Sequence, residues 1–197
     1  MNNSAIAAEY LRQTGLRPAI LDVDVHHGNG TQGIFYARGD VLTVSLHADP
    51  TDHCPFFWAH AQERGAGAGL GANLNLPLVR GTGDAGFLEA LAHGLRRIEA
   101  FEANVIVVAL GLDANEDDPF QGLAVTSDRF ARIGAAIAAT GKPLLLVQEG
   151  GYVSDTLGTA LFSFHHRSWR RIDVTQQTAC AHGLPPHQRD AVTRAKA

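Results

Sequence analysis

The chain has 197 residues, two cysteines, ten histidines and a formal net charge of −4, which fits one ordinary soluble domain. Because 45% of the residues are hydrophobic and 18% are charged, the chain can bury a substantial core, and intrinsic disorder is excluded. Cys54 and Cys180 are too few and too far apart for a disulfide framework or a cysteine-rich zinc ribbon, so we expect a reducing, cytoplasmic setting.

The first half of the chain begins with a predicted helix that two buried strands follow. Ser4 can cap a helix whose apolar residues keep helical spacing as far as Gly15. Residues 19–25 (AILDVDV) predict a buried strand with two carboxylates near its end. Residues 41–46 (VLTVSL) form another mainly apolar run and predict a second buried strand.

The second half continues this alternation of helices and strands. Helical stretches are predicted over residues 86–101 and 127–139, and strands over residues 105–110 (VIVVAL) and 143–147 (PLLLV). The strands are apolar on both faces, which is typical of a mostly parallel sheet with helices on both sides. The predicted fold class is therefore α/β. No apolar run approaches the roughly 18 residues that a spanning helix needs, so we expect no membrane partner.

Charge is unevenly distributed along the chain. Residues 1–166 carry 10 Lys and Arg against 18 Asp and Glu, whereas residues 167–197 carry six against two. The acidic body disfavours a nucleic-acid partner and favours a cationic ligand. We expect residues 1–162 to form the folded catalytic domain. Residues 163–197, where the apolar periodicity fades, are expected to form a basic, loosely ordered tail.

Polar residues follow three of the four predicted strands, at the sheet edge where open α/β folds bind ligands. Asp22, Asp24 and His26 end the first strand and face one side if the strand continues to His26. Asp113 follows the third strand and Tyr152 the fourth. An Asp at a strand end often only caps a turn. Two carboxylates and an imidazole converging with Asp113 nevertheless predict a site for a divalent ion such as zinc, iron or cobalt.

Four motifs in order along the chain carry a family resemblance. They are ILDVDVHHGNGTQ at residues 20–32, VSLH at residues 44–47, LGLD at residues 110–113 with Asp118-Pro119, and EGGY at residues 149–152. With these motifs, residues 1–160 resemble the zinc-dependent histone deacetylase superfamily, and most nearly its bacterial acetylpolyamine amidohydrolases. The resemblance implies an arginase/deacetylase-like α/β sheet that lacks the first strands of the family, so the chain would be the later part of the catalytic domain.

The resemblance assigns roles to the residues of the site. Asp24, His26 and Asp113 would be the zinc ligands, although ligand types alone do not separate zinc from ferrous iron. Tyr152 would donate its hydroxyl to the oxyanion that forms from an acetamide carbonyl. The family's structural potassium site would be formed by Asp22, Ser45 and Leu46, together with backbone oxygens of Asp24 and His26.

The resemblance also places a substrate channel. Its walls would include Cys54 and Phe56, and Gly150 and Gly151 would let the backbone pass close to the substrate. Cys54 stands where the family usually has an aromatic side chain, a change for which Phe56 or Phe57 would have to compensate. The substrate would be a small cationic acetylated amine or an acetyl-lysine peptide.

The family's general base and acid are not matched in this sequence. The family places them as a tandem His-His pair upstream of the region that corresponds to Met1. The adjacent pair His165-His166 lies in a segment that resembles the closing helix of the family, and His27, next to the ligand His26, is expected to point away from the substrate. We therefore expect the 197 residues alone to deacetylate weakly or not at all.

Three functional hypotheses follow. The leading one is a zinc-dependent amidohydrolase that removes acetyl groups from acetylpolyamines or acetyl-lysine. The second is a truncated metal-binding remnant that keeps the zinc site without the histidine pair. The third, an arginase-like hydrolase, would need a second metal ion, for which the sequence offers too few further ligands. Because the family's first strands would be missing, the sheet would expose an apolar edge or face, and we expect self-association.

Overall fold

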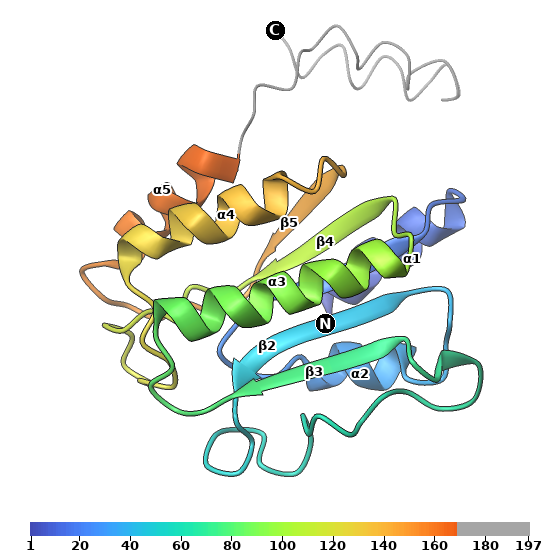
Figure 1. The fold of residues 1–197 in the computed structure, drawn as a ribbon, viewed down its shortest axis with the longest axis horizontal. Helices are drawn as coiled ribbons and strands as arrows, with labels where there is room; N and C mark the ends of the chain where they lie inside the picture. Colours follow the sequence, from blue (N-terminus) through green and yellow to red (C-terminus); the bar gives the residue numbers. More distant parts are fainter. Residues whose placement is uncertain (169–197) are drawn as a thin grey trace, which may run out of the picture.

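The computed structural model describes residues 1–168, which form a five-stranded parallel sheet between two layers of helices (Figure 1). In chain order the strands are β1 (Pro18–Asp22), β2 (Leu42–Ala48), β3 (Asn73–Leu78), β4 (Val105–Leu110) and β5 (Leu144–Gln148). Their order across the sheet is β3-β2-β1-β4-β5, and every neighbouring pair is parallel. This arrangement confirms the predicted α/β class.

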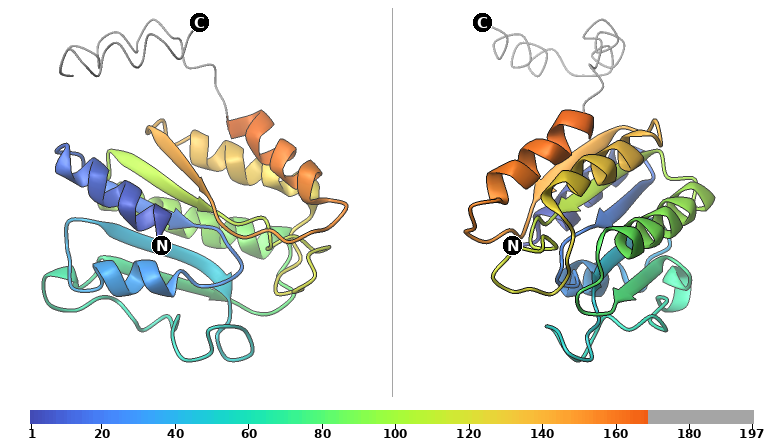
Figure 2. Two further views of the ribbon diagram at one scale, coloured as in Figure 1. Left: turned by 180° about the vertical axis from the view of Figure 1, so that it is seen from behind. Right: turned by 60° about the vertical axis from the view of Figure 1, so that its left-hand side comes forward.

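Helices cover both faces of the sheet (Figure 2). They are α1 (Asn3–Gln13), α2 (Asn29–Phe35), α3 (Asp84–Ala100), α4 (Phe130–Ala138) and α5 (Leu157–Ser168), with short 3-10 turns at Gly67–Gly69 and Ser127–Arg129. The helices α3, α4 and α5 pack on one face, where the larger core lies, and α1 and α2 pack on the other. Gly94 lets α3 approach β2 closely, because a Cβ at this residue would lie 2.9 Å from Val44 Cγ1.

The first strand is shorter than predicted. β1 ends at Asp22, because Asp22 Oδ1 accepts a hydrogen bond from Asp24 N at 3.1 Å and Asp24 Oδ1 accepts one from His26 N at 2.8 Å. Such bonds from a side chain to the backbone two residues later turn the chain out of the strand ladder. The prediction that the strand runs through residue 25 is therefore wrong, yet the same turns gather these side chains at the strand end.

Two further local features differ from the sequence-based expectation. The cap of α1 is Asn2, whose Oδ1 accepts a hydrogen bond from Ala5 N at 2.8 Å. The predicted cap Ser4 is instead buried in the first turn and donates its hydroxyl to Glu149 at 2.8 Å. The strand β3 is not among the predicted strands, because its sequence NLNLPL contains buried amides and a proline in place of an apolar run.

The last described helix crosses the boundary predicted at residue 162. α5 continues to Ser168, and its Phe164 is fully buried in the larger core. Residues 169–197 lie outside the described part, so the division into a domain and a basic tail stays a prediction. Among the helices of residues 1–168, none combines the length and apolar character needed to cross a membrane.

The strand β5 forms one edge of the sheet and is covered less than its neighbours. Its five residues are only half-buried or exposed, whereas β1, β2 and β4 are buried throughout. Leu145 is 41% exposed. An apolar edge strand with free backbone groups is a template for pairing with another chain.

We expect the chain to self-associate through β5. Leu145→Glu should weaken the self-association constant by about tenfold or more, because a carboxylate placed at a strand-to-strand contact must be desolvated. Sedimentation velocity over a range of concentrations measures this constant. Ile6→Glu, at an exposed apolar residue of α1, is the matched control and should have little effect. A wild-type chain that stays monomeric at every concentration would contradict the expectation.

Candidate metal centre

Three side chains from neighbouring strands meet at the carboxyl edge of the sheet. Asp24 and His26 lie in the loop after β1, and Asp113 follows β4, which pairs with β1. His26 Nδ1 lies 3.2 Å from Asp24 Oδ1 and 3.2 Å from Asp113 Oδ2. Candidate ligand atoms of the three residues all lie within 4.8 Å of one another. Within residues 1–168 this is the one group of three or more His, Cys, Asp or Glu arranged in this way. We call these three residues, as a candidate site for a metal ion, the metal centre.

Backbone N–H groups hold the two carboxylates of the metal centre in place. Asp113 Oδ1 accepts a hydrogen bond from Val25 N at 3.0 Å, and Asp24 Oδ2 accepts one from Gly150 N at 2.8 Å. Asp24 is 8% exposed and Asp113 is fully buried. Two carboxylates this close together and this far from water need a cation or a proton between them.

Two glycines make room for these carboxylates. A Cβ on Gly150 would collide with carboxylate oxygens of Asp113 and Asp24, and a Cβ on Gly111 would collide with Asp24. At Gly151 the backbone itself requires glycine, because φ is +125°. The carboxylates of Asp113 and Asp24 therefore occupy the space beside Gly150. That the backbone of Gly150 and Gly151 lies close to a substrate stays a prediction.

A proton on His26 offsets part of the negative charge of the metal centre when no metal ion is present. Hydrogen bonds to Asp113 and then to Asp24 raise the pKa of His26 to about 10. Burial raises the pKa of the Asp113 carboxyl, and the charge of Asp24 adds to the rise. One imidazole nitrogen and two carboxylates, with positions left for water and substrate, are a donor set that fits a divalent transition ion. Such an ion would take the place of the proton.

Tyr152 lies beside the metal centre, after β5 and on the more exposed side. Its ring centroid is 6.3 Å from that of His26, and the ring of Phe120 lies 4.5 Å from Tyr152 and 5.5 Å from His26. Burial of the hydroxyl, followed by the charges of Asp113 and Asp24, raises the pKa of Tyr152. The phenol therefore keeps its proton at neutral pH and can act as a hydrogen-bond donor.

The predicted channel residues lie on loops and are largely open to solvent. Cys54 is exposed, and the ring centroid of its neighbour His53 lies 5.1 Å from that of His26. Phe56 is 62% and Phe57 is 69% exposed. The structure thus leaves one end of this loop near the metal centre, and the channel itself stays a prediction.

The residues predicted for potassium lie on β1 and β2. Asp22 and Ser45 are partners in register and both are buried. Burial and then the charge of Asp24 raise the pKa of Asp22 well above its usual value. His47 Nε2 donates to Ala59 O at 3.0 Å, so its Nδ1 accepts the Ser45 hydroxyl proton at 2.8 Å. The Ser45 oxygen therefore keeps its lone pairs for another partner.

Two rings at the metal centre are not predicted as site residues. His53 is 9% exposed, and its ring centroid lies 5.1 Å from that of His26. Its buried Nε2 has no hydrogen-bond partner among the described residues. Neither His53 nor Phe120 ends a predicted strand. The only sequence signal for Phe120 is its place directly after Asp118-Pro119.

Comparison with known proteins decides the family. The family model for the histone deacetylase domain matches residues 1–166. The chain belongs to the histone deacetylase family. This confirms the resemblance carried by the four motifs and favours it over the arginase-like alternative.

Acetylpolyamine amidohydrolases are among the similar proteins of this family. The enzyme of that name from Burkholderia pseudomallei is 48% identical over 164 residues, which are 83% of this chain and 48% of that protein. The one from Mycoplana ramosa is 50% identical over 159 residues, 80% of this chain and 47% of that protein. The chain thus spans about half the length of the curated relatives it matches.

Solved structures of the histone deacetylase family share the fold. The crystal structure of acetylpolyamine aminohydrolase from Burkholderia pseudomallei matches with a TM-score of 0.83 and 46% identity, covering 85% of this chain and 49% of that one. A histone deacetylase homologue complexed with SAHA matches with a TM-score of 0.78 and 32% identity, covering 87% and 47%. The parallel sheet described above is therefore the fold of this family.

Proposed function

We propose that this chain carries the metal-binding part of a zinc-dependent amidohydrolase that removes acetyl groups from acetylated polyamines in the cytoplasm. The observation that carries the proposal is the meeting of Asp24, His26 and Asp113 at one sheet edge, with Tyr152 on the open side. The names of the two relatives support the substrate class. The acidic body of the chain supports it as well, because a polyamine is cationic.

Asp24, His26 and Asp113 would hold the ion, and ferrous iron suits the same donors as zinc. When bound, the ion would supply a Lewis acid for the amide carbonyl and for the attacking water. The backbone N–H of Gly150 keeps one oxygen of Asp24 in position, and the missing side chain of Gly150 keeps the carboxylates free to face the ion.

We also propose a structural potassium ion held by Asp22, Ser45 and the backbone of Leu46. A carboxylate buried beside a second carboxylate favours a cation. Ser45 already donates its proton to His47, so only its oxygen lone pairs remain for a ligand. Potassium binds hard oxygen donors of this kind.

Tyr152 would donate its hydroxyl to the oxygen of the substrate carbonyl as negative charge develops there. Amide hydrolysis also needs a group that takes a proton from water and one that protonates the amine. His26 is engaged with two carboxylates, and His27 is hydrogen-bonded inside the protein. Because general acid–base help is worth about 10²–10⁴-fold, we propose that the 197 residues alone hydrolyse slowly.

Replacing Tyr152 tests the proposed reaction. In the zinc-loaded chain, Tyr152→Phe should lower kcat toward an acetylated polyamine by about 10²–10³-fold, the usual effect of losing one oxyanion donor. Zinc content should stay unchanged. An acetyl-lysine peptide, assayed in parallel, distinguishes the two substrate classes.

Tyr10→Phe, at an exposed residue of α1, is the matched control and should keep the wild-type rate. Turnover that survives Tyr152→Phe would contradict the assigned role. Zinc binding with no turnover of either substrate would instead favour the metal-binding remnant.

A further inference from the structure

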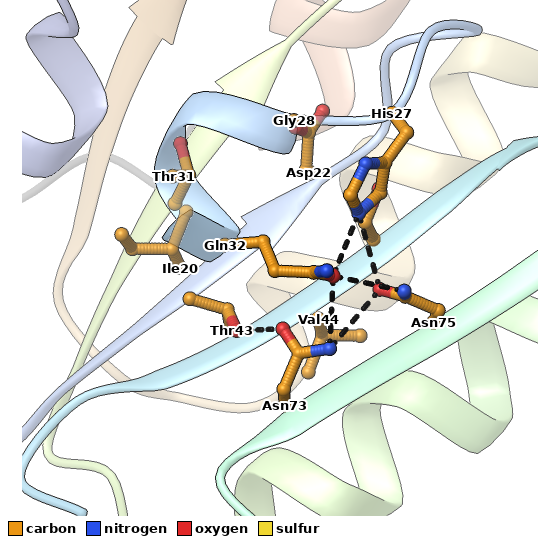
Figure 3. Close-up of a pocket in the computed structure, with 11 residues that line it drawn as sticks. Ile20, Asp22, His27, Gly28, Thr31, Gln32, Thr43, Val44, Asn73 and Asn75 are labelled. Carbon is orange, nitrogen blue, oxygen red and sulfur yellow. Dashed lines mark hydrogen bonds between the residues drawn. The ribbon is translucent and has the colours of Figure 1, made fainter. Parts of the chain in front are cut away.

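A second group of polar side chains lies buried beside the metal centre, around a cavity of about 10 Å³ (Figure 3). His27 and Gln32 are each 5% exposed, and Asn73 and Asn75 of β3 are 3% and 2% exposed. We call Gln32, Asn73 and Asn75 the amide cluster. Buried amides are costly unless hydrogen-bonded, and the way these amides are satisfied determines how His27 is held.

The carboxylate of Glu63 fixes the orientation of the Gln32 amide in the amide cluster. This carboxylate can only accept, so Gln32 donates from Nε2 to Glu63 Oε2 at 2.7 Å. Gln32 therefore presents its oxygen to the other members. That oxygen accepts from Asn73 Nδ2 at 3.0 Å, from Asn75 Nδ2 at 2.9 Å and from His27 Nε2 at 3.0 Å.

The His27 ring consequently donates from Nε2 to the Gln32 oxygen. The same nitrogen also lies 3.3 Å from Asn75 Oδ1. The Nδ1 atom has no hydrogen-bond partner among the described residues, and Figure 3 shows it turned away from Gln32 and Asn75. The ring is therefore fixed through Nε2 alone, with the ring of His47 packed against it at 4.7 Å between centroids.

The position of His27 matters because it is joined by a peptide bond to the metal ligand His26. The segment between β1 and α2 has no regular secondary structure, and the turns at Asp22 and Asp24 hold it on the β1 side. On the other side, the His27 ring ties this segment to β3, two strands away across the sheet. His26 must stay fixed for its Nδ1 to remain 3.2 Å from two carboxylates.

We propose that His27, fixed through its Nε2 by the amide cluster and Glu63, is a positioning residue that holds the metal ligand His26 in place. The inference rests on the metal centre proposed above. Residues that orient a ligand without touching the ion typically change metal affinity by about 10- to 100-fold when replaced. A network that only satisfied buried amides would change stability without a matching change in metal affinity.

Two substitutions of His27 distinguish the roles of its two ring nitrogens. His27→Gln keeps an N–H donor at the place of Nε2, whereas His27→Asn places its amide near Nδ1 and leaves Nε2 without a counterpart. The zinc dissociation constant of each variant of the chain is measured by competition with a chelator. We expect His27→Gln to stay within about threefold of wild type. His27→Asn and Asn75→Leu should bind about 10- to 100-fold more weakly.

Thr43→Val is the matched control. The Thr43 hydroxyl donates to Asn73 Oδ1 at 2.5 Å and does not touch His27. Its loss should lower the urea midpoint of the metal-free chain while the zinc constant stays within about twofold of wild type. Zinc affinity that simply follows the urea midpoint across all variants would overturn the proposal, as would equal affinities of His27→Gln and His27→Asn.

A metal-independent measurement separates this proposal from the metal centre itself. Hydrogen exchange of the backbone amides of residues 24–30 is followed in the metal-free chain. Faster exchange in His27→Asn than in His27→Gln is expected, and equal exchange would overturn the positioning role. A wild-type chain that binds no zinc would refute the metal centre, and the exchange rates would then decide the role of His27 alone.

Discussion

Gly150→Ala is expected to abolish zinc binding, although it adds only one methyl group. The new Cβ would collide with carboxylate oxygens of both Asp113 and Asp24. Neither carboxylate can move freely, because each accepts a backbone hydrogen bond on its other side, from Val25 and His26. The added methyl therefore displaces two of the three ligands at once. Because the backbone of Gly150 does not have a positive φ, the effect is steric and not conformational.

Gly158→Ala is the matched control for this change. Gly158 lies in α5, and a Cβ there has no atom within 4 Å. Alanine should stabilise the helix by up to about 1 kcal/mol and leave the zinc dissociation constant unchanged. Chelator competition measures the constant for both variants, and circular dichroism shows whether both fold. A folded Gly150→Ala chain with wild-type zinc affinity would mean that the ion does not lie between these carboxylates.

Asp113→Asn should weaken zinc binding by about 10²–10³-fold. Structural zinc sites are worth about 10–16 kcal/mol in total, so one of a few ligands accounts for about 3–4 kcal/mol. The side chain keeps its shape and loses its charge. Asp117→Asn, at an exposed residue of the same loop, should leave the affinity unchanged. Equal zinc content in wild type and Asp113→Asn after dialysis against a weak chelator would contradict the site.

The same substitution changes the pH dependence of the site. Asp113 is the largest cause of the raised pKa of His26, which stands at about 10 in the metal-free chain. The proton must leave Nδ1 before this atom can bind an ion, so zinc affinity should rise about tenfold per pH unit below pH 10. In Asp113→Asn the pKa of His26 should fall toward its ordinary value of about 6.5. The rise of zinc affinity with pH should then level off at a lower pH than in the wild type. NMR titration of the His26 ring measures the pKa directly.

The raised pKa of His26 also makes the stability of the metal-free chain depend on pH. The folded pKa of His26 lies above its unfolded value, so its contribution to the metal-free fold is complete below pH about 6.5. It is lost as the pH rises through about 10. Urea unfolding of the metal-free wild type should therefore show falling stability between these pH values. Asp113→Asn should lose most of that dependence, and an unchanged dependence would show that the His26 proton is not held by Asp113.

The sequence alone was sufficient for the fold class and for the expectation that Asp24, His26 and Asp113 lie close together. Continuous apolar runs such as residues 105–110 predict buried parallel strands, because only a sheet covered on both faces accommodates them. Asp24, His26 and Asp113 follow two of these strands, and neighbouring parallel strands end at one edge of a sheet. The structure does bring the three side chains together. The four motifs identified the family because their order along the chain is specific.

Only the tertiary structure decided how these residues are held. The strand ends at Asp22 because side-chain oxygens of Asp22 and Asp24 accept backbone N–H groups, a competition that a hydrophobic pattern does not record. β3 carries Asn73 and Asn75 in its buried part, so it lacks the apolar run of a buried strand, and only the partners Gln32 and Glu63 explain the burial of these amides.

Contacts between residues far apart in sequence account for the remaining differences. Nothing in the sequence distinguishes Gly150 from an ordinary loop glycine. A side chain is excluded at this residue because the carboxylates of Asp113 and Asp24, which are 37 and 126 residues away in sequence, occupy the space. The ring of His53 reaches His26 through the folding of a loop that has no periodic pattern. Local sequence patterns indicate which residues form strands and which polar side chains follow the strand ends. The free energy of burying polar groups determines their partners, and that depends on three-dimensional neighbours that the sequence does not display.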